Sequence, residues 1–161
     1  WKDRDVEFFK DSAISVDIMG LNFYPQWSVS EFTAKNNTSN VLESVRLPVS
    51  MGVEASKQIV ADYWTRYKLP IMITETSVYG SIEEKAEWLK DSTAALFELQ
   101  KEAVEIVGYT WFPVIDMINW DYKIQEGAAD QFLIHLGLYD IERNPYKFAI
   151  ETFKEIVKTY E

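Results

Sequence analysis

The chain has 161 residues, of which 47% are hydrophobic and 15% aromatic, with 6 glycines and 5 prolines. This composition predicts a globular chain with a core and excludes a disordered one. A formal net charge of −10 argues against electrostatic binding to nucleic acid or to an anionic membrane, because both would repel it. Without cysteine, disulfides and thiolate metal sites are excluded, and no apolar run reaches the roughly 18 residues of a membrane span.

Short apolar strands alternate along the chain with longer amphipathic helices, which is the pattern of parallel β/α units. The first strand is expected over residues 16–23. The stretch over 25–50 is rich in Ser, Asn and Thr and predicts a long loop. A helix is then expected over 53–67, and Pro70 lies just beyond its end.

The second unit has a strand over 71–74 and a helix that should begin at Ser81, because Ser81 and Glu84 have the spacing of a capping box. Apolar residues at helical spacing predict a buried stripe, and the charged residues between them are expected to face water. The stripe comprises Ile82, Ala86, Leu89, Leu96 and Leu99, and the water-facing set comprises Glu83, Lys85, Glu87 and Lys90.

The third unit has a strand near 106–112, a long loop, and a last helix for which Asn144 is the expected N-cap and Pro145 the first residue. Three parallel units would leave two open edges, which a closed barrel removes. A (β/α)8 TIM barrel typically needs about 250 residues. We therefore expect an α/β chain in which residues 1–161 are the last three β/α units of such a barrel, with the N-terminal units missing.

Glu75 follows a fully apolar run at the predicted carboxyl end of the second strand. Parallel-sheet enzymes carry their chemistry at this edge. A glutamate at a strand end can also be an ordinary surface carboxylate. The apolar strand before Glu75 and the small residues after it favour a crevice, and therefore a catalytic role.

Asn22 and Tyr24 close the first predicted strand. Their simplest role is local hydrogen bonding. A tyrosine hydroxyl on a strand next to Glu75 would instead donate to that carboxylate and hold it ionised and oriented.

Beyond the third strand, residues 111–120 combine Trp111 and Trp120 with the polar Asp116 and Asn119. Most aromatic clusters are core. Tryptophan also stacks on the apolar faces of sugar rings, and amides and carboxylates bind hydroxyls. The mixture therefore suits a carbohydrate pocket as well.

His135 is the only histidine, so two-histidine metal sites and the His-Glu-x-x-His protease motif are excluded. The chain has no Gly-x-Ser-x-Gly elbow, dinucleotide fingerprint or phosphate loop. His135 is therefore expected to be structural.

In chain order, the three strand ends resemble the final three units of family 1 glycoside hydrolases, the β-glucosidase-type (β/α)8 barrels. Residues 17–24 resemble the strand-six motif Asp-Phe-Ile-Gly-Ile-Asn-Tyr-Tyr, and 70–75 resemble Pro-Ile-Tyr-Ile-Thr-Glu, which carries the nucleophile. Residues 108–120 resemble the strand-eight motif that ends Asp-Asn-Phe-Glu-Trp, and 135–145 resemble the segment before the last helix.

The resemblance implies a retaining β-glycosidase, in which two carboxylates about 5 Å apart act as nucleophile and acid. Glu75 would be the nucleophile and Tyr24 its orienting donor, without a metal or an organic cofactor. The family's acid lies in an Asn-Glu-Pro tripeptide, which this chain lacks, so the acid is expected upstream and the fragment alone should be inactive. The residues implied for the sugar subsite are Asn22, Trp111, Asn119 and Trp120.

The sequence also departs from the family pattern, because Thr76 and Ser77 replace the usual Asn-Gly and Asn119 replaces a sugar-binding Glu. These changes keep a noncatalytic carbohydrate-binding or scaffold barrel as an alternative. Because the strand edges would be open, a third alternative is a half-barrel that is completed by homo-oligomerisation. The expected partners are a glycoside or oligosaccharide and the missing N-terminal part of the barrel, and the sequence leaves the sugar, the linkage and the compartment open.

Overall fold

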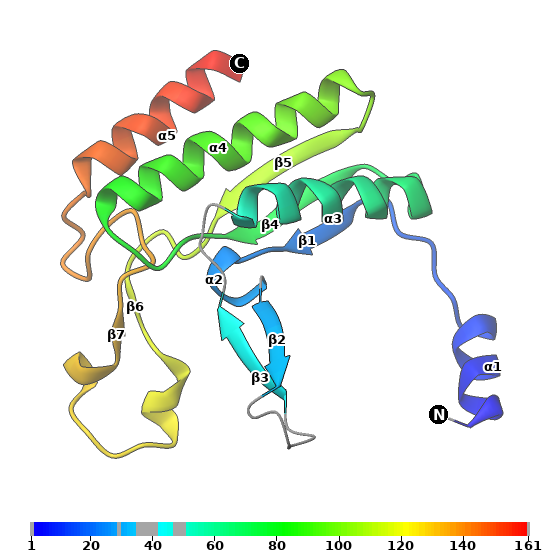
Figure 1. Cartoon of the computed structure of the whole chain (residues 1–161), viewed down its shortest axis with the longest axis horizontal. Coiled ribbons are helices and arrows are strands. Elements are labelled where there is room, and N and C mark those ends of the chain that lie inside the picture. Colours follow the sequence, from blue (N-terminus) through cyan, green and yellow to red (C-terminus); the bar gives the residue numbers. More distant parts are fainter. Residues whose placement is uncertain (1, 29, 35–41, 47–50, 161) are drawn as a thin grey trace.

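The computed structural model describes residues 2–28, 30–34, 42–46 and 51–160 as a mixed α/β structure (Figure 1). At its centre lies a three-stranded sheet with both pairings parallel. The predicted strands are confirmed, although the first is shorter than expected. In spatial order they are β1 (Met19–Asn22), β4 (Ile71–Thr76) and β5 (Ile106–Trp111).

Three long helices lie on the same side of this sheet (Figure 1). They are α3 (Met51–Tyr67), α4 (Ile82–Lys101) and α5 (Lys147–Tyr160). The predicted capping box of α4 is confirmed, because Oγ of Ser81 accepts from the amide N of Glu84 at 3.2 Å and a carboxylate oxygen of Glu84 accepts from the amide N of Ser81 at 2.7 Å. The reciprocal pair satisfies two backbone donors and fixes where the helix starts.

The core consists of two apolar clusters between the sheet and the helices. Four residues of the predicted stripe of α4 are buried: Ala86, Leu89, Leu96 and Leu99. The three leucines belong to these clusters. Burial of such side chains from both the strands and the helices holds the β/α units together. The first cluster comprises Leu21, Val60, Ile71, Ile73, Leu96, Leu99 and Val104, and the second comprises Phe23, Val78, Trp88, Leu89, Trp111, Leu138 and Ala149.

The segment after β1 is more regular than the predicted loop over 25–50. It begins with the short helix α2 (Pro25–Ser28) and continues as an antiparallel hairpin of β2 (Ser30–Ala34) and β3 (Leu42–Arg46). The expectation of an irregular loop is wrong for these elements, and residues 29, 35–41 and 47–50 lie outside the described part. A hairpin needs only two short runs that pair through the main chain, so its periodic signal is weak among polar residues.

The predicted start of the last helix is also wrong, because α5 begins at Lys147. The amide N and Nδ2 of Asn144 donate to the carboxylate of Asp140 at 2.7 and 2.8 Å, and Pro145 forms a bridge with Tyr139. Asn144 and Pro145 therefore close a tight loop before the helix. A polar side chain before a helix can either cap the helix or close a turn, so the sequence alone does not distinguish the two roles.

Shorter elements complete the described chain. Helix α1 (Asp3–Asp11) has no buried residue and carries the acidic run near the N-terminus. The segment between β5 and α5 contains the strands β6 (Met117–Ile118) and β7 (Leu133–Ile134), which pair antiparallel. None of the described helices is both long enough and apolar enough to cross a membrane.

Candidate active site

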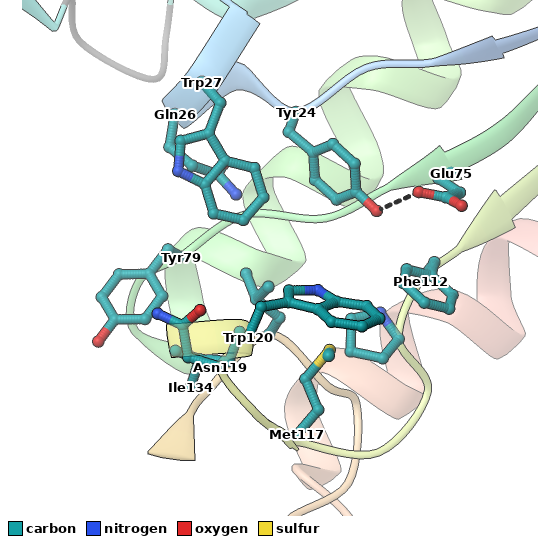
Figure 2. Close-up of a pocket in the computed structure, with 12 residues that line it drawn as sticks. Tyr24, Gln26, Trp27, Glu75, Tyr79, Phe112, Met117, Asn119, Trp120 and Ile134 are labelled. Atoms are coloured by element: carbon teal, nitrogen blue, oxygen red, sulfur yellow. Dashed lines mark hydrogen bonds between the residues drawn. The ribbon is translucent and has the colours of Figure 1, made fainter. Parts of the chain in front are cut away.

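The carboxyl ends of the three parallel strands meet at one edge of the sheet. The amide N of Phe23 donates to the carbonyl of Glu75 at 2.9 Å, and the amide N of Phe112 donates to the carbonyl of Thr76 at 2.9 Å. These bonds continue the sheet pairing past β1 and β5. As a result, Tyr24, Glu75 and Phe112 line the same cavity (Figure 2).

Glu75 and Tyr24 form a hydrogen bond in which the Tyr24 hydroxyl donates to Oε2 of Glu75 at 2.8 Å (Figure 2). Burial, and then the neighbouring carboxylate, raise the pKa of Tyr24 well above its ordinary value of 10.0, so the hydroxyl keeps the proton that it donates. Within the described part of the chain, Tyr24 is the one hydrogen-bond donor to this carboxylate. The other carboxylate oxygen is therefore available to a ligand.

The cavity at this edge has a volume of about 580 Å³, within the range of small-ligand sites. Its walls are mostly aromatic and apolar, and among the lining residues that the structure describes Glu75 is the one charged side chain. An uncharged wall around a single carboxylate suits a neutral ligand with polar groups. The lining residues are Tyr24, Gln26, Trp27, Glu75, Tyr79, Phe112, Pro113, Met117, Asn119, Trp120, Ile134 and Leu136.

Four of the six residues that the sequence singles out lie on this cavity: Tyr24, Glu75, Asn119 and Trp120. Figure 2 shows the indole of Trp120 below the ring of Tyr24, with Phe112 beside it and near Glu75. Trp120 is 68% exposed, and Nζ of Lys123 lies 4.5 Å from the centre of its ring.

Trp111 and Asn22 are placed differently from the expectation, because neither is among the lining residues. Trp111 is 3% exposed and its indole N–H donates to the carbonyl of Leu136 at 3.0 Å. Asn22 accepts a hydrogen bond from the Thr74 hydroxyl at 2.7 Å. Successive side chains on a strand point to opposite faces, so Trp111 points into the core while the next residue, Phe112, faces the cavity.

Gln26 and Trp27 on α2 and Tyr79 after β4 also line the cavity, and the sequence pattern does not identify them. Gln26 is 3% exposed, and neither its amide N nor its amide O has a hydrogen-bond partner among the described residues. An unpaired buried donor or acceptor costs about 1–3 kcal/mol. The expectation of a loop over 25–50 hid these residues, although an aromatic ring directly after a strand end is a usable signal.

A second carboxylate, Asp116, lies in a buried network behind the cavity. Oδ1 accepts from the amide N of Gly137 at 2.7 Å, and Oδ2 accepts from the Tyr146 hydroxyl at 2.6 Å. Nδ1 of His135, which the sequence suggests is structural, lies 2.7 Å from the same Oδ2. These contacts satisfy both oxygens of a carboxylate that has no exposed surface.

Lys85, which the sequence analysis expected to face water, is 1% exposed and joins this network. Its ammonium donates to the carbonyl of Gly137 at 2.9 Å and lies 4.3 Å from the centre of the Tyr146 ring. Burial lowers the pKa of Lys85, and the charge of Asp116 opposes that shift. The helical position of Lys85 was correct, but partners far away in the sequence give the ammonium a buried site.

The network pins the segment that follows β5. Gly137 packs so closely against the main chain of Ile115, Asp116 and Tyr139 that a Cβ atom would clash with all three. This segment carries Asn119 and Trp120 to the cavity. The buried network therefore fixes one wall of the candidate site.

Among the described residues, no group of three or more His, Asp or Glu side chains is arranged to hold a metal ion.

No family model matches the chain, and no curated protein matches it in sequence. Solved β-glucosidase structures match its fold. A β-glucosidase from Exiguobacterium marinum matches with a TM-score of 0.70 and 20% identity over 100% of this chain and 38% of its own. A β-glucosidase from Thermotoga maritima, in complex with azafagomine, matches with a TM-score of 0.64 and 18% identity over 98% of this chain and 41% of its own.

The AHE enzyme from Alicyclobacillus herbarius matches with a TM-score of 0.71 and 15% identity over 100% of this chain and 38% of its own. The chain thus spans about two fifths of the length of these solved structures. At such identities the likeness concerns the fold: the mixed α/β structure matches TIM-barrel glycosidases over part of their length.

Proposed function

We propose that this chain is the C-terminal segment of a (β/α)8 retaining β-glycosidase and supplies its last three β/α units. Glu75 is the nucleophile and Tyr24 orients it. Asn119 and Trp120 contribute to the sugar subsite, and no metal or cofactor takes part. The likeness to part of the β-glucosidase fold supports this proposal.

The observation that carries the proposal is the hydrogen bond between Tyr24 and Glu75 on the wall of a largely aromatic cavity, whose other described lining residues are uncharged. A retaining glycosidase needs a carboxylate that is ionised, held in one orientation and open on the side of the sugar. The hydrogen bond from the Tyr24 hydroxyl stabilises the charged form of Glu75 and fixes the position of one carboxylate oxygen. The remaining oxygen can reach the substrate.

In the reaction, a carboxylate oxygen of Glu75 forms a bond to the anomeric carbon as the bond from that carbon to the leaving-group oxygen breaks. The partner acid gives its proton to the leaving group. Water then attacks the same carbon, returns a proton to the partner residue and releases Glu75. Aromatic rings such as that of Trp120 stack on the sugar, and amides such as that of Asn119 bind its hydroxyls.

The partner acid is assigned to the upstream units of the barrel. The chain has no Asn-Glu-Pro tripeptide, and within the described part of the cavity wall Glu75 is the one carboxylate. Two carboxyl groups about 5 Å apart are required for retention. The 161 residues alone are therefore expected to be inactive, and activity is a property of the full-length protein.

The proposal is tested by trapping the glycosyl-enzyme. Full-length protein is incubated with a 2-deoxy-2-fluoro glycoside, whose covalent intermediate is long-lived, and the label is located by peptide mass spectrometry. We expect the label on Glu75. The Glu75→Gln variant should take none, and Glu54→Gln, a change at an exposed glutamate of α3, should be labelled like the wild type. Labelling of another residue would refute the assignment.

One departure from the family pattern has a packing explanation. Thr76 and Ser77, which follow Glu75, are 1% and 0% exposed, and Oγ1 of Thr76 accepts from the indole N–H of Trp88 at 3.0 Å. Neither residue lines the cavity. Their identity therefore bears on the core more than on turnover, which weakens the case for a noncatalytic barrel.

The noncatalytic alternative keeps one observation in its favour, the amide Asn119 on the cavity wall where the family has a carboxylate. Sugar binding by the full-length protein without turnover or covalent labelling would establish that alternative. The half-barrel alternative rests on the sheet, in which β1 and β5 each pair on one side only among the described strands. A stable, compact monomer in light scattering would contradict it.

A further inference from the structure

We propose that Lys123 is a positioning residue for the candidate site, because its ammonium holds the indole of Trp120 in the orientation that faces the cavity. Lys123 lies outside the motif over 108–120 and is not among the residues that line the cavity. It belongs to the lobe between β6 and β7, which extends away from the central sheet (Figure 1). This inference rests on the proposed glycosidase function and adds to it a residue that acts through another side chain.

Trp120 and Lys123 are the first and the last residue of a 3₁₀ helix, η1 (Trp120–Lys123). Side chains three residues apart lie on the same side of a 3₁₀ helix. Nζ of Lys123 accordingly lies 4.5 Å from the centre of the Trp120 ring, within the range of a cation–π contact. Among the described residues the Lys123 ammonium forms no salt bridge, so no carboxylate competes with the indole for it.

The cation and the cavity lie on different sides of the indole. Trp120 lines the cavity and Lys123 does not, so the ammonium approaches the ring from the side that is turned away from the cavity. In Figure 2 the indole lies below the ring of Tyr24 and beside Phe112, and both of these residues also line the cavity. A sugar can therefore stack on the cavity side of the indole while Lys123 stays in place on the other side.

The indole of Trp120 has little packing to hold it, because the residue is 68% exposed. A ring with so much free surface can change its side-chain torsion angles without losing many contacts. A cation over the ring favours one orientation, since the contact is lost when the ring turns. Holding the ring before the substrate arrives reduces the ordering cost of binding.

The main chain of the lobe is fixed by contacts that do not involve Lys123. The amide N of Asn119 donates to the carbonyl of Phe132 at 2.7 Å, and the amide N of Tyr122 donates to the carbonyl of Asn119 at 3.1 Å. The rings of Tyr122 and Phe132 have their centres 5.6 Å apart, which joins η1 to a second 3₁₀ helix, η2 (Ala129–Phe132). Replacement of the exposed Lys123 should therefore change the orientation of Trp120 and leave the fold of the lobe intact.

The first test separates substrate binding from turnover. Full-length protein is assayed with two neutral substrates, 4-nitrophenyl β-glucoside and 4-nitrophenyl β-galactoside. For the accepted substrate, Lys123→Met should raise KM about two- to fivefold, the scale of an exposed cation–π contact. The value of kcat should stay within about 1.5-fold of the wild type, because stacking stabilises the bound substrate and the transition state alike.

Two further variants show whether the charge at position 123 is responsible. Lys123→Arg keeps a cation that can stack on the indole, so KM should stay within about 1.5-fold of the wild type. Lys154→Met, the same loss of charge at an exposed lysine of α5, should match the wild type.

A double-mutant cycle shows whether Lys123 acts through the indole. In a Trp120→Leu background, the added Lys123→Met change should alter KM by less than about 1.5-fold, because the ring that Lys123 positions is absent. Three results would each overturn the inference: an unchanged KM in Lys123→Met, an equal rise of KM in Lys123→Arg, or an equal rise in the Trp120→Leu background.

A measurement without substrate separates this inference from the proposed hydrolysis. If the wild type turns over no glycoside, the proposed function fails. The full-length protein is then labelled with 5-fluorotryptophan for fluorine NMR, and the Trp120 resonance is identified by its absence in Trp120→Leu. Lys123→Met should shift this resonance and leave the others in place, and Lys154→Met should shift none. A Trp120 resonance that Lys123→Met leaves unmoved would overturn the inference.

Discussion

Two carboxylates in this molecule each accept a hydrogen bond from a tyrosine hydroxyl, and their surroundings differ. Glu75 accepts from Tyr24 at 2.8 Å on the wall of an open cavity. Asp116 accepts from Tyr146 at 2.6 Å, and its second oxygen is taken by the amide of Gly137, in a site without exposed surface. The same pair of groups thus occurs once with a free oxygen and once fully satisfied.

This difference separates a candidate nucleophile from a structural group. A carboxylate with both oxygens bound and a buried ammonium in the same network, that of Lys85, contributes to the fold and has no capacity left for a substrate. Among the described residues, Glu75 has a hydrogen-bond partner on one carboxylate oxygen alone, and it faces a cavity that suits a neutral ligand. The number of donors and the access to the cavity therefore distinguish the two pairs better than residue type does.

The largest expected effect comes from making the same acid-to-amide change at both carboxylates. Glu75→Gln should lower kcat/KM of the full-length protein by about 10⁴-fold or more, because the proposed nucleophile is lost, and should change the free energy of unfolding by less than about 1 kcal/mol. Asp116→Asn should lower that free energy by roughly 3–5 kcal/mol, because the buried charge of Lys85 loses its counter-charge. Glycoside hydrolysis and urea unfolding measure the two effects.

The contrast between the two carboxylates would be contradicted if both variants changed activity and stability in the same way. Asp116→Asn with full stability, or Glu75→Gln with a large loss of stability, would mean that the roles are wrongly divided. Asp62→Asn on α3, where the side chain accepts from Gln58 on the exposed face at 2.8 Å, serves as the control and should change the free energy of unfolding by less than about 0.5 kcal/mol.

A smaller effect is expected from removing the donor in each pair. Tyr24→Phe should lower kcat about 10- to 100-fold, because one charge-assisted hydrogen bond that orients Glu75 is lost. Tyr146→Phe should lower the free energy of unfolding by about 1.5–3 kcal/mol through the bond to Asp116 and should leave kcat within about threefold of the wild type. The two effects are read from glycoside hydrolysis and urea unfolding, and a large loss of kcat in Tyr146→Phe would show that the pairs are not independent.

The smallest expected effect appears at alkaline pH. Burial and the adjacent carboxylate raise the pKa of both Tyr24 and Tyr146 above 10.0, so the unfolded chain releases these protons first. The two tyrosines therefore make their full contribution to the free energy of unfolding below pH 10.0, and that contribution falls as the pH rises above 10.0. Wild type should therefore lose stability more steeply above that pH than Tyr24→Phe or Tyr146→Phe does, by less than about 1.4 kcal/mol per pH unit because solvent screens partly buried groups.

Urea unfolding from about pH 8 to about pH 11 measures these slopes. Burial lowers the pKa of Lys85, so the contribution of Lys85 to stability rises with pH. All three proteins contain Lys85, and its contribution therefore cancels when their slopes are compared. Equal slopes in wild type and both variants would contradict the assigned hydrogen bonds.

The parts of the fold that follow from local pattern could be predicted from the sequence. Apolar runs identify β1, β4 and β5, and the capping box at Ser81 fixes the start of α4. The carboxyl ends of parallel strands share one edge, so the hydrogen bond between Tyr24 and Glu75 also follows from strand order. These features depend on residues that are neighbours in sequence or in a predicted sheet.

Other features depend on contacts that the sequence pattern does not carry. The buried place of Lys85 requires Gly137 and Tyr146, which come from distant parts of the chain. The cavity position of Gln26 depends on a short helix without a periodic signal. Trp111 and Phe112 are adjacent at the end of a strand, and a shift of one residue decides which ring faces the core.

The close packing at Gly137 also bears on how the protein can diverge over evolutionary time. Many core positions accept another apolar residue of similar volume, so their identity drifts while the fold persists. Position 137 has no such freedom, since even one methyl group would collide with main-chain atoms of three residues. This chain is only 15–20% identical to the solved structures. At such identity, we expect a glycine packed in this way to change less than the hydrophobic residues around it and to be a better reference point for aligning distant homologues.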